Sequence, residues 1–294
     1  MKQSTINETI LLVGHGSREQ SGNKEIEDFA AQWRIRQPQR RLEVCFIEFA
    51  EVLIEAGLDR AARHGGRVII VPLILNAAGH VKMEIPEHVE HARLRHPQVE
   101  FIYCHHLGAN KEILTILKRN LRKAMAELDM PDPRNTGVIL LGRGSSDRVA
   151  NGEVAKIARW LYEEGEHPMV DIAFTGITHP RLESVVQRQS KLDMRQIVVL
   201  PFYLFTGTLI ERIDRQVARL QAQYTQIHFA LADYFGFEEE VYDLLEQRIR
   251  EATDQVAPRM MECDGCKYRE FAADHGHGHN HDDHLHSHAA ETAS

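Results

Sequence analysis

Two histidines and a glutamate stand at the ends of apolar segments, where their side chains could act together. His15 lies in a Gly-His-Gly-Ser turn directly after the apolar run 10–13, and Glu48 and His80 follow the next two apolar runs. Two imidazoles and a carboxylate suit a borderline divalent ion such as cobalt, iron, nickel or zinc. We therefore predict a metal site that is made of these three residues and leaves coordination positions open.

Other interpretations of the same residues remain open at this point. His80 can be an ordinary loop residue, and Glu48 can be an ordinary surface acid. The glycines around His15 also fit a nucleotide-binding turn, but residues 14–18 lack the third glycine of the dinucleotide fingerprint and the Gly-Lys-Ser/Thr of a P-loop.

A second set of possible metal ligands lies near the carboxyl end. Cys263 and Cys266 form a Cys-x-x-Cys unit outside the strand–helix context of a thioredoxin-type redox motif. Two thiolates do not complete a tetrahedral zinc site without other ligands. The alternative to any metal site here is a pair of thiols that binds no metal. Seven histidines then alternate with small or polar residues: His275, His277, His279, His281, His284, His286 and His288. This low-complexity stretch predicts an accessory metal-binding tail that is disordered without metal.

The elements that must position the first set alternate between strands and helices. The expected strands are 10–13, 43–47, 67–72 and 99–104, and the amphipathic helical segments between and after them are 26–33, 52–63, 81–94 and 109–128. Such alternation predicts a parallel sheet with helices on both faces. In open α/β sheets ligands bind at the carboxyl edge of the strands, which is the edge toward which all three residues would project.

The same order of elements begins again after a linker at 130–135. Val-Ile-Leu-Leu-Gly-Arg-Gly-Ser at 138–145 repeats Ile-Leu-Leu-Val-Gly-His-Gly-Ser at 10–17, an offset of 128 residues. The offset predicts an internal duplication that forms two similar α/β lobes, each with a four-stranded parallel sheet flanked by helices, and a cleft between them. The predicted units are a first lobe at 1–130, a second lobe at 131–257 and a tail at 258–294.

The two copies differ at the positions that could do chemistry. His15 is replaced by Arg143, Glu48 by Gly176 and His80 by Thr208, each 128 residues further on. Residues with a purely structural role would be expected to be the same in both copies. We therefore predict a single metal site in the first lobe.

Composition excludes several classes of function. The 294 residues are 43% hydrophobic and 27% charged, with a formal net charge of −8 that argues against binding to nucleic acid or to a membrane surface. No segment reaches the apolar length of a membrane span, and residues 1–9 contain no signal-peptide core. We expect a cytoplasmic protein, in which Cys45 and Cys104 are buried thiols and not part of a disulfide framework.

Several motifs taken together resemble those of the class II chelatases. These are Leu-x-Gly-His-Gly-Ser-Arg at 12–18, Phe-Ile-Glu-Phe-Ala-Glu at 46–51, Pro-Leu at 72–73, Ala-Gly-His-Val at 78–81 and Glu-Ile-Pro at 84–86. The resemblance is strongest to the long, two-lobed CbiX type and covers both lobes. Val52 departs from the pattern, because many relatives have proline after the Ala-Glu pair.

The resemblance implies a chelatase-like fold and the insertion of cobalt into sirohydrochlorin on the anaerobic cobalamin route. Close relatives insert iron, for siroheme, or nickel. By position, His15 and His80 would be metal ligands and catalytic residues, with Glu48 as the acidic partner. Long members of the family also carry Met-x-Cys-x-x-Cys, as at 261–266, and bind an iron–sulfur cluster there. The cluster would take further ligands from elsewhere, so the protein would be a monomer or a homodimer joined through the tail.

The tetrapyrrole would lie in the cleft, and its carboxylates would need cationic partners. Ser17, Arg18, Arg143 and Arg212 are the candidates for substrate binding, although an ordinary surface role for each arginine is an equal alternative. Two other functions remain open: a non-catalytic cobalt or nickel metallochaperone or store, which the tail suggests, and a ferredoxin-like redox module. The residues do not distinguish cobalt, iron and nickel as the physiological metal.

Overall fold

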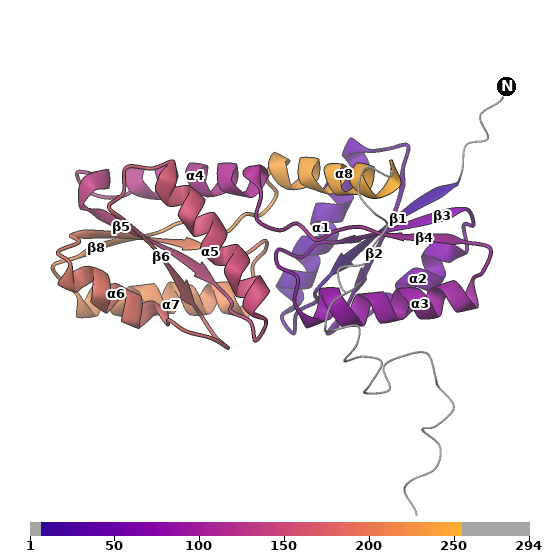
Figure 1. The fold of residues 1–294 in the computed structure, drawn as a ribbon, viewed down its shortest axis with the longest axis horizontal. Helices are drawn as coiled ribbons and strands as arrows, with labels where there is room; N and C mark the ends of the chain where they lie inside the picture. The colour runs from indigo at the N-terminus through magenta and orange to yellow at the C-terminus, as the bar shows by residue number, and fades with distance from the viewer. Residues whose placement is uncertain (1–6, 255–294) are drawn as a thin grey trace, which may run out of the picture.

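Two similar parallel sheets form the two halves of the molecule (Figure 1). The computed structural model describes residues 7–254. In the first sheet the strand order is β2-β1-β3-β4, and in the second it is β6-β5-β7-β8. The strands are β1 (Glu8–Gly14), β2 (Arg41–Phe46), β3 (Arg67–Pro72), β4 (Glu100–Tyr103), β5 (Thr136–Gly142), β6 (Met169–Phe174), β7 (Gln196–Pro201) and β8 (His228–Leu231). The prediction of two α/β lobes with four-stranded parallel sheets is confirmed.

Helices cover both faces of each sheet. They are α1 (Gln20–Arg36), α2 (Ile54–Ala62), a π-helical turn η1 (His80–Glu84), α3 (Ile85–Arg95), α4 (Lys111–Ala126), a 3₁₀ turn η2 (Pro133–Asn135), α5 (Arg148–Glu163), α6 (Leu182–Lys191), α7 (Thr208–Gln223) and α8 (Glu239–Thr253). The helix expected at 81–94 therefore begins as a π-helical turn, a feature that is frequent at functional sites.

Local sequence explains where these elements form. The six residues after Glu8 in β1 are all buried, as expected for a strand covered on both faces. Asn110 begins α4 by accepting a hydrogen bond from the Ile113 amide, and apolar residues on one side of the helix are buried. Cys45 and Cys104 are buried and unpaired, as predicted.

The last helix of each copy packs on the sheet of the other copy. Helix α4 contacts β7 and β8 of the second sheet, whereas α8 contacts β3 and β4 of the first. Figure 1 shows α4 above the second sheet and α8 above the first. The chain therefore passes between the lobes at 104–110 and again at 232–238. The segment 130–135 separates the two copies in the sequence, but in space it connects α4 to β5 within the second lobe.

This exchange of helices gives the two lobes a shared hydrophobic core. One continuous cluster contains Leu12 and Phe29 of the first copy together with Leu140 and Leu245 of the second. The rings of Phe29 on α1 and Tyr242 on α8 stack with centroids 4.1 Å apart. The opposite faces of the sheets have separate cores under α2 and α3 and under α6 and α7. The lobes are thus joined by packed side chains and not by linkers alone.

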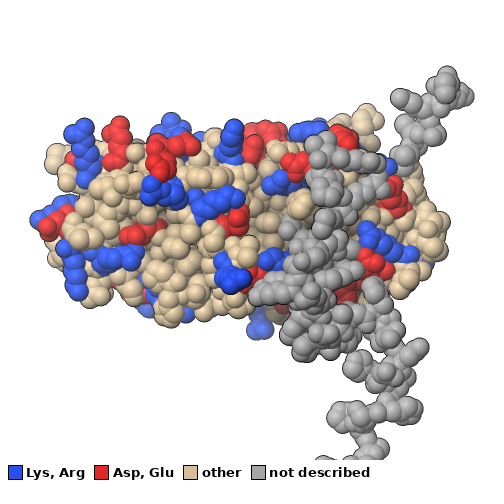
Figure 2. Space-filling model, viewed as in Figure 1, with Lys and Arg blue, Asp and Glu red and all other residues tan. Residues whose placement is uncertain are grey.

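Neither the helices of the described residues nor the charge on the face in Figure 2 has the pattern of a membrane span or of a nucleic-acid-binding protein. None of the helices within residues 7–254 combines the length and the apolar character needed to cross a bilayer. On the face drawn in Figure 2, basic and acidic side chains are interspersed around the grey region. Outside the grey region, the part of that face formed by residues 7–254 shows no single-sign basic patch of the kind found in many nucleic-acid-binding proteins.

Candidate metal centre between the lobes

The order of strands brings the three predicted ligands to one point. In the first sheet β1 lies between β2 and β3. The chain therefore leaves β1 toward β2 on one side and later returns to β3 on the other side. Ligands of open α/β folds bind at the carboxyl ends of the strands where the order reverses in this way. His15 follows β1, Glu48 follows β2 and His80 begins η1 after β3. One ligand atom from each of the three lies within 4.8 Å of the others, and all three residues are half-buried.

Gly16 allows the turn after β1 to approach Glu48. Its φ of +91° is left-handed, and a Cβ added there would overlap the Glu48 carbonyl oxygen. The Glu48 amide donates a hydrogen bond to the His15 carbonyl at 3.1 Å, which holds the two segments together. Gly144 has the same geometry against Gly176 in the second lobe, with a φ of +85°. The glycines thus position the loop in both copies, although only the first copy has the predicted metal-binding side chains.

The partners of His15 define its protonation. Its Nδ1 lies 3.1 Å from the Gly16 carbonyl oxygen and 3.5 Å from Glu48 Oε1, and both of these atoms only accept hydrogen bonds. Its Nε2 lies 3.2 Å from Nη1 of Arg143, which only donates. These contacts assign the proton to Nδ1 and a lone pair to Nε2. Burial lowers the pKa of His15, which favours this neutral form.

Glu84 orients His80 and was missed by the sequence analysis as a site residue. His80 Nδ1 and Glu84 Oε2 are 2.5 Å apart. The hydrogen bond to the Glu84 carboxylate raises the pKa of His80, and the same bond lowers the pKa of Glu84. Metal-binding histidines commonly donate one ring nitrogen to a carboxylate in this way, which leaves Nε2 free for the ion. The rings of His15 and His80 meet edge to face, with centroids 4.7 Å apart.

The internal repeat could have identified Glu84. Helix α7 spans the residues that correspond, at the offset of 128, to η1 and α3 together. Glu84 then aligns with Arg212, just as His15, Glu48 and His80 align with Arg143, Gly176 and Thr208. The second copy therefore has neither imidazole nor carboxylate at these four positions and has two guanidinium groups instead.

A cleft of about 730 Å³ opens beside the three predicted ligands and is lined by both lobes. Three of the predicted substrate-binding residues, Ser17, Arg18 and Arg143, line this cleft. The Ser17 hydroxyl accepts a hydrogen bond from the Glu19 amide, so it also shapes the turn into α1. Arg212 is exposed on α7 and is not among the residues that line the cleft.

Two exposed apolar residues that line the cleft were also missed. Phe49 and Ile177 have left-handed φ values of 53° and 61° and are 46% and 61% exposed. They are 128 residues apart, so each follows the same strand of its copy. Left-handed backbone at such residues is strained and is concentrated at functional sites. The guanidinium of Arg18 lies 4.8 Å from the centre of the Phe49 ring.

A buried ion pair connects η1 to the second lobe. Lys82 Nζ and Asp147 Oδ2 are 2.6 Å apart, and their side chains are 9% and 4% exposed. Asp147 also caps α5 by accepting a hydrogen bond from the Val149 amide. Because Lys82 lies two residues after His80, the pair places the turn that carries His80 against the opposite lobe.

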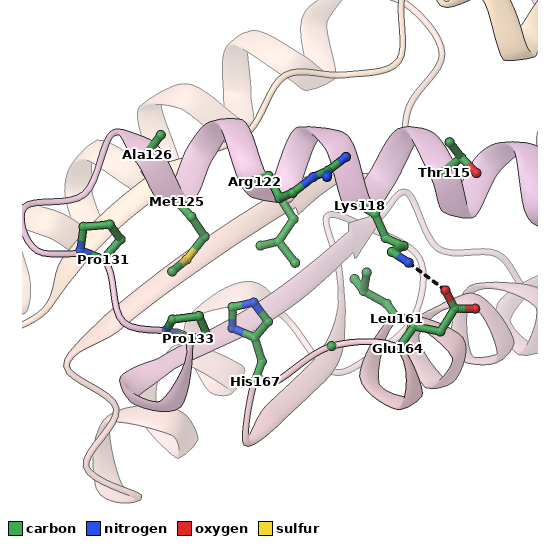
Figure 3. Close-up of a pocket in the computed structure, with 12 residues that line it drawn as sticks. Thr115, Lys118, Arg122, Met125, Ala126, Pro131, Pro133, Leu161, Glu164 and His167 are labelled. Atoms are coloured by element: carbon green, nitrogen blue, oxygen red, sulfur yellow. Dashed lines mark hydrogen bonds and ion pairs between the residues drawn. The ribbon is translucent and has the colours of Figure 1, made fainter.

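A second pocket, of about 620 Å³, lies between α4, α5 and the segment that follows α4 (Figure 3). Lys118 at its edge already pairs with Glu164 at 2.7 Å. His167 lies 3.1 Å from the Thr136 carbonyl through Nδ1, and burial lowers its pKa. The pocket contains one imidazole and no pair of carboxylates. Within residues 7–254, His15, Glu48 and His80 are the one group of three that could hold a metal ion.

The predicted ligands of the tail lie outside the described residues. This applies to Cys263, Cys266 and the seven histidines from His275 to His288. Their roles in an iron–sulfur cluster and in accessory metal binding therefore remain predictions.

Known proteins are similar to this chain over most of its length. The CbiX family matches residues 9–124 and again 137–252. The sirohydrochlorin cobaltochelatase of Priestia megaterium is 36% identical over 270 residues, which is 91% of this chain and 86% of that relative. The sirohydrochlorin ferrochelatase of the same organism is 30% identical over 244 residues, 83% of this chain and 90% of the relative.

A solved structure extends the comparison to three dimensions. SirB from Bacillus subtilis with Fe3+ superimposes with a TM-score of 0.75 at 29% identity, covering 87% of this chain and all of that one. The two matches to this family lie 128 residues apart, which is the offset of the internal repeat.

Proposed function

The chain belongs to the CbiX family of class II chelatases in its long two-lobed form, and we propose that it inserts cobalt into sirohydrochlorin. The metal ion and the tetrapyrrole are both substrates in this reaction. The observation that carries the proposal is the group of His15, Glu48 and His80, whose ligand atoms lie within 4.8 Å of one another beside the cleft.

The donor set fits a site that passes its metal onward. Two neutral imidazoles and a carboxylate bind a divalent ion with open positions, so the ion can be transferred to another ligand. The lowered pKa of His15 keeps that imidazole neutral, and the Glu84 carboxylate orients His80. All three ligands come from the first lobe, and the second lobe forms the opposite wall of the cleft.

The reaction requires that two protons leave the macrocycle as the metal enters. His15 and His80 hold the ion at the carboxyl edge of the first sheet. Glu48 accepts one of the two protons from a pyrrole nitrogen, and the other proton leaves to solvent water. General-base assistance of this kind contributes roughly 10²–10⁴-fold to a rate. Arg18 and Arg143 bind the peripheral carboxylates of the tetrapyrrole, while Phe49 and Ile177 contact its apolar surface.

A direct assay tests the proposal. The full-length protein is incubated with sirohydrochlorin and Co²⁺, and the absorbance change of metal insertion is compared with a protein-free control and with His15→Ala. We expect insertion above the control for the wild type and most of it lost in the variant. A folded, metal-loaded wild type with no rate above the control would instead favour a metallochaperone or store.

Iron is the second candidate metal, because a sirohydrochlorin ferrochelatase is also 30% identical over 83% of the chain. Initial rates with Co²⁺, Fe²⁺ and Ni²⁺ at equal free concentrations distinguish the metals. We expect cobalt to give the highest kcat/KM. A higher value for iron or nickel would reassign the substrate metal and leave the chelatase proposal intact.

The tail would supply a cluster site in addition to its metal-gathering histidines. We propose that Cys263 and Cys266 ligate an iron–sulfur cluster, with the remaining ligands from a second protomer or from other residue types, because Cys45 and Cys104 are buried in the first lobe. Replacement of both tail cysteines by serine should remove the cluster signal in electron paramagnetic resonance and leave most chelation. Loss of all chelation would instead favour a redox module.

A further inference from the structure

Arg143 reaches across the cleft to a proposed metal ligand. It belongs to the second lobe, yet its Nη1 lies 3.2 Å from Nε2 of His15. Among residues 7–254 no carboxylate forms an ion pair with the Arg143 guanidinium, which donates to this imidazole instead. A guanidinium without an anionic partner, at the edge of a substrate cleft, is available to bind an anion.

In this arrangement His15 has no lone pair to offer a metal ion. Nδ1 carries the proton, because it faces the Gly16 carbonyl oxygen and the Glu48 carboxylate. The lone pair on Nε2 accepts the hydrogen bond from Arg143. Coordination through Nε2 requires Arg143 to leave. Coordination through Nδ1 would move the proton to Nε2, where it would face the guanidinium donor, so Arg143 must leave in that case as well.

We propose that Arg143 is a gate on the metal site: it blocks His15 in the substrate-free protein and releases it when a carboxylate of the bound tetrapyrrole takes the guanidinium. The identity of that anion rests on the proposed function, whereas the block itself rests on the geometry alone. A carboxylate competes well with a neutral imidazole for a guanidinium, because a charge-assisted pair is stronger and can be bidentate.

The gate couples the two substrates. Tetrapyrrole binding raises the affinity of the site for the metal ion, and by linkage the metal raises the affinity for the tetrapyrrole to the same extent. The substrate-free protein therefore avoids holding a metal ion at His15 until an acceptor is present. Arg143 acts on the reaction through His15 in this role and is a positioning residue for the metal.

Equilibrium titration with Co²⁺ alone tests the block. The full chain is titrated while its d–d absorption is followed, and His15→Ala, which keeps the tail histidines, supplies the background to subtract. We expect Arg143→Ala to bind Co²⁺ about tenfold more tightly than the wild type at the His15 site, equivalent to about 1.4 kcal/mol. A variant with damaged structure would bind more weakly and not more tightly. Equal or weaker binding by folded Arg143→Ala overturns the gate.

Two controls separate the block from simple repulsion between cations. The double variant His15→Ala/Arg143→Ala should match His15→Ala, because the gain acts through His15. The titrations are also repeated at about 0.05 M and 0.5 M KCl, since salt screens repulsion between exposed charges far more than it weakens a direct hydrogen bond. A gain that persists at high salt supports the gate, and a gain that disappears there overturns it.

Rapid mixing tests the coupling to the tetrapyrrole. Protein preincubated with Co²⁺ is mixed with saturating sirohydrochlorin. With free Co²⁺ set between the two dissociation constants, we expect a larger burst of insertion from Arg143→Ala, in which most sites are already loaded, than from the wild type. A burst of equal size in the wild type overturns the gate. Absence of insertion by either protein at any time would refute the proposed function, while the Co²⁺ titration would still decide whether Arg143 blocks His15.

Discussion

At the scale of single residues, the two copies have acquired opposite chemistry on the same scaffold. At the four aligned positions the first copy has imidazoles and carboxylates, the groups that suit a cation, and the second has the guanidinium groups of Arg143 and Arg212, which carry a positive charge. The loops themselves have stayed alike, as the left-handed glycines at 16 and 144 show. Divergence has therefore changed the ligands and kept the turns that hold them.

The asymmetry leads to the first prediction. His15→Ala and His80→Ala should each remove most cobalt insertion without unfolding the protein, because both side chains are half-buried beside a cleft and not in the core. Arg143→Ala should raise the KM for the tetrapyrrole more than it lowers kcat. Steady-state kinetics and thermal melts followed by circular dichroism measure these effects. An inactive Arg143→Ala beside a normal His15→Ala would place the active site in the other lobe.

The second prediction concerns the pH dependence of metal binding. A metal ion needs neutral His80, and Glu84 raises the pKa of His80, so binding is lost as the pH falls through that raised value. Glu84→Gln removes the cause of the shift. We expect the acid limb of Co²⁺ binding to move to lower pH, and the affinity at about pH 8 to fall about tenfold because the ring is less well oriented.

The matched control for this change is Glu87→Gln, which removes a carboxylate in the first turn of α3 that does not line the cleft. It should leave the pH profile unchanged. The same shifts determine how the pair affects the stability of the fold at different pH. The raised pKa of His80 stabilises the fold below pH 6.5, and the lowered pKa of Glu84 stabilises it above pH 4.5. The pair therefore stabilises most between these values. An unmoved profile in Glu84→Gln would contradict the positioning role.

At the scale of elements, η1 joins the proposed metal site to the interface between the lobes. It begins with His80, ends with Glu84 and carries Lys82 between them. Since Lys82 is buried against Asp147 at the start of α5, the turn contacts both lobes. Displacement of α5 relative to the first sheet would thus shift a proposed metal ligand.

The third prediction is that Lys82→Met destabilises the protein by roughly 3–5 kcal/mol, because it leaves Asp147 buried beside an apolar side chain. Urea denaturation measures the change. The double variant Lys82→Met/Asp147→Leu should recover much of the loss, apart from about 1 kcal/mol for the missing cap of α5. Lys156→Met, in an exposed pair with Glu153, should cost less than about 1 kcal/mol. If Lys82→Met lowered the free energy of unfolding by no more than Lys156→Met does, the prediction would be wrong.

At the scale of the whole molecule, the exchanged helices make each half depend on the other. Without α8, part of the first sheet over β3 and β4 loses its cover, and without the second sheet α4 has no surface on which to bury its apolar side. The lobes therefore share one core on this side and have separate cores on the other.

The fourth prediction follows from this exchange. Residues 1–130 expressed alone should not form a stable folded monomer; two copies should associate by exchanging α4, or one copy should bind residues 131–257 expressed with it. Analytical ultracentrifugation and urea denaturation test this expectation. A folded monomer of 1–130 with the stability of the full chain would show that α4 can fold back onto its own sheet.

The fifth prediction concerns the tail. Deletion from His275 onward should leave the insertion rate unchanged at saturating cobalt and lower it only when cobalt is scarce, because a metal-gathering segment acts through local concentration. Rates measured across a buffered range of free Co²⁺ test this. A reduced rate at saturation would assign the tail a part in the reaction itself.

The repeated α/β pattern and the three residues of the proposed metal site follow from the sequence alone. Both depend on local rules: apolar runs form buried strands, and residues that follow parallel strands meet at one edge of the sheet. For that reason the pattern of apolar runs is sufficient to place His15, Glu48 and His80 together, although they are far apart in the chain.

How the two copies meet depends instead on the packing of the whole chain. The amphipathic pattern of α4 predicts a buried face but not which sheet it covers, because two homologous sheets offer similar apolar surfaces. The hydrogen bond from Arg143 to His15 and the ion pair of Lys82 with Asp147 each join residues of different lobes. Such contacts depend on the relative placement of the lobes, which long-range packing sets and which no local pattern in the sequence encodes.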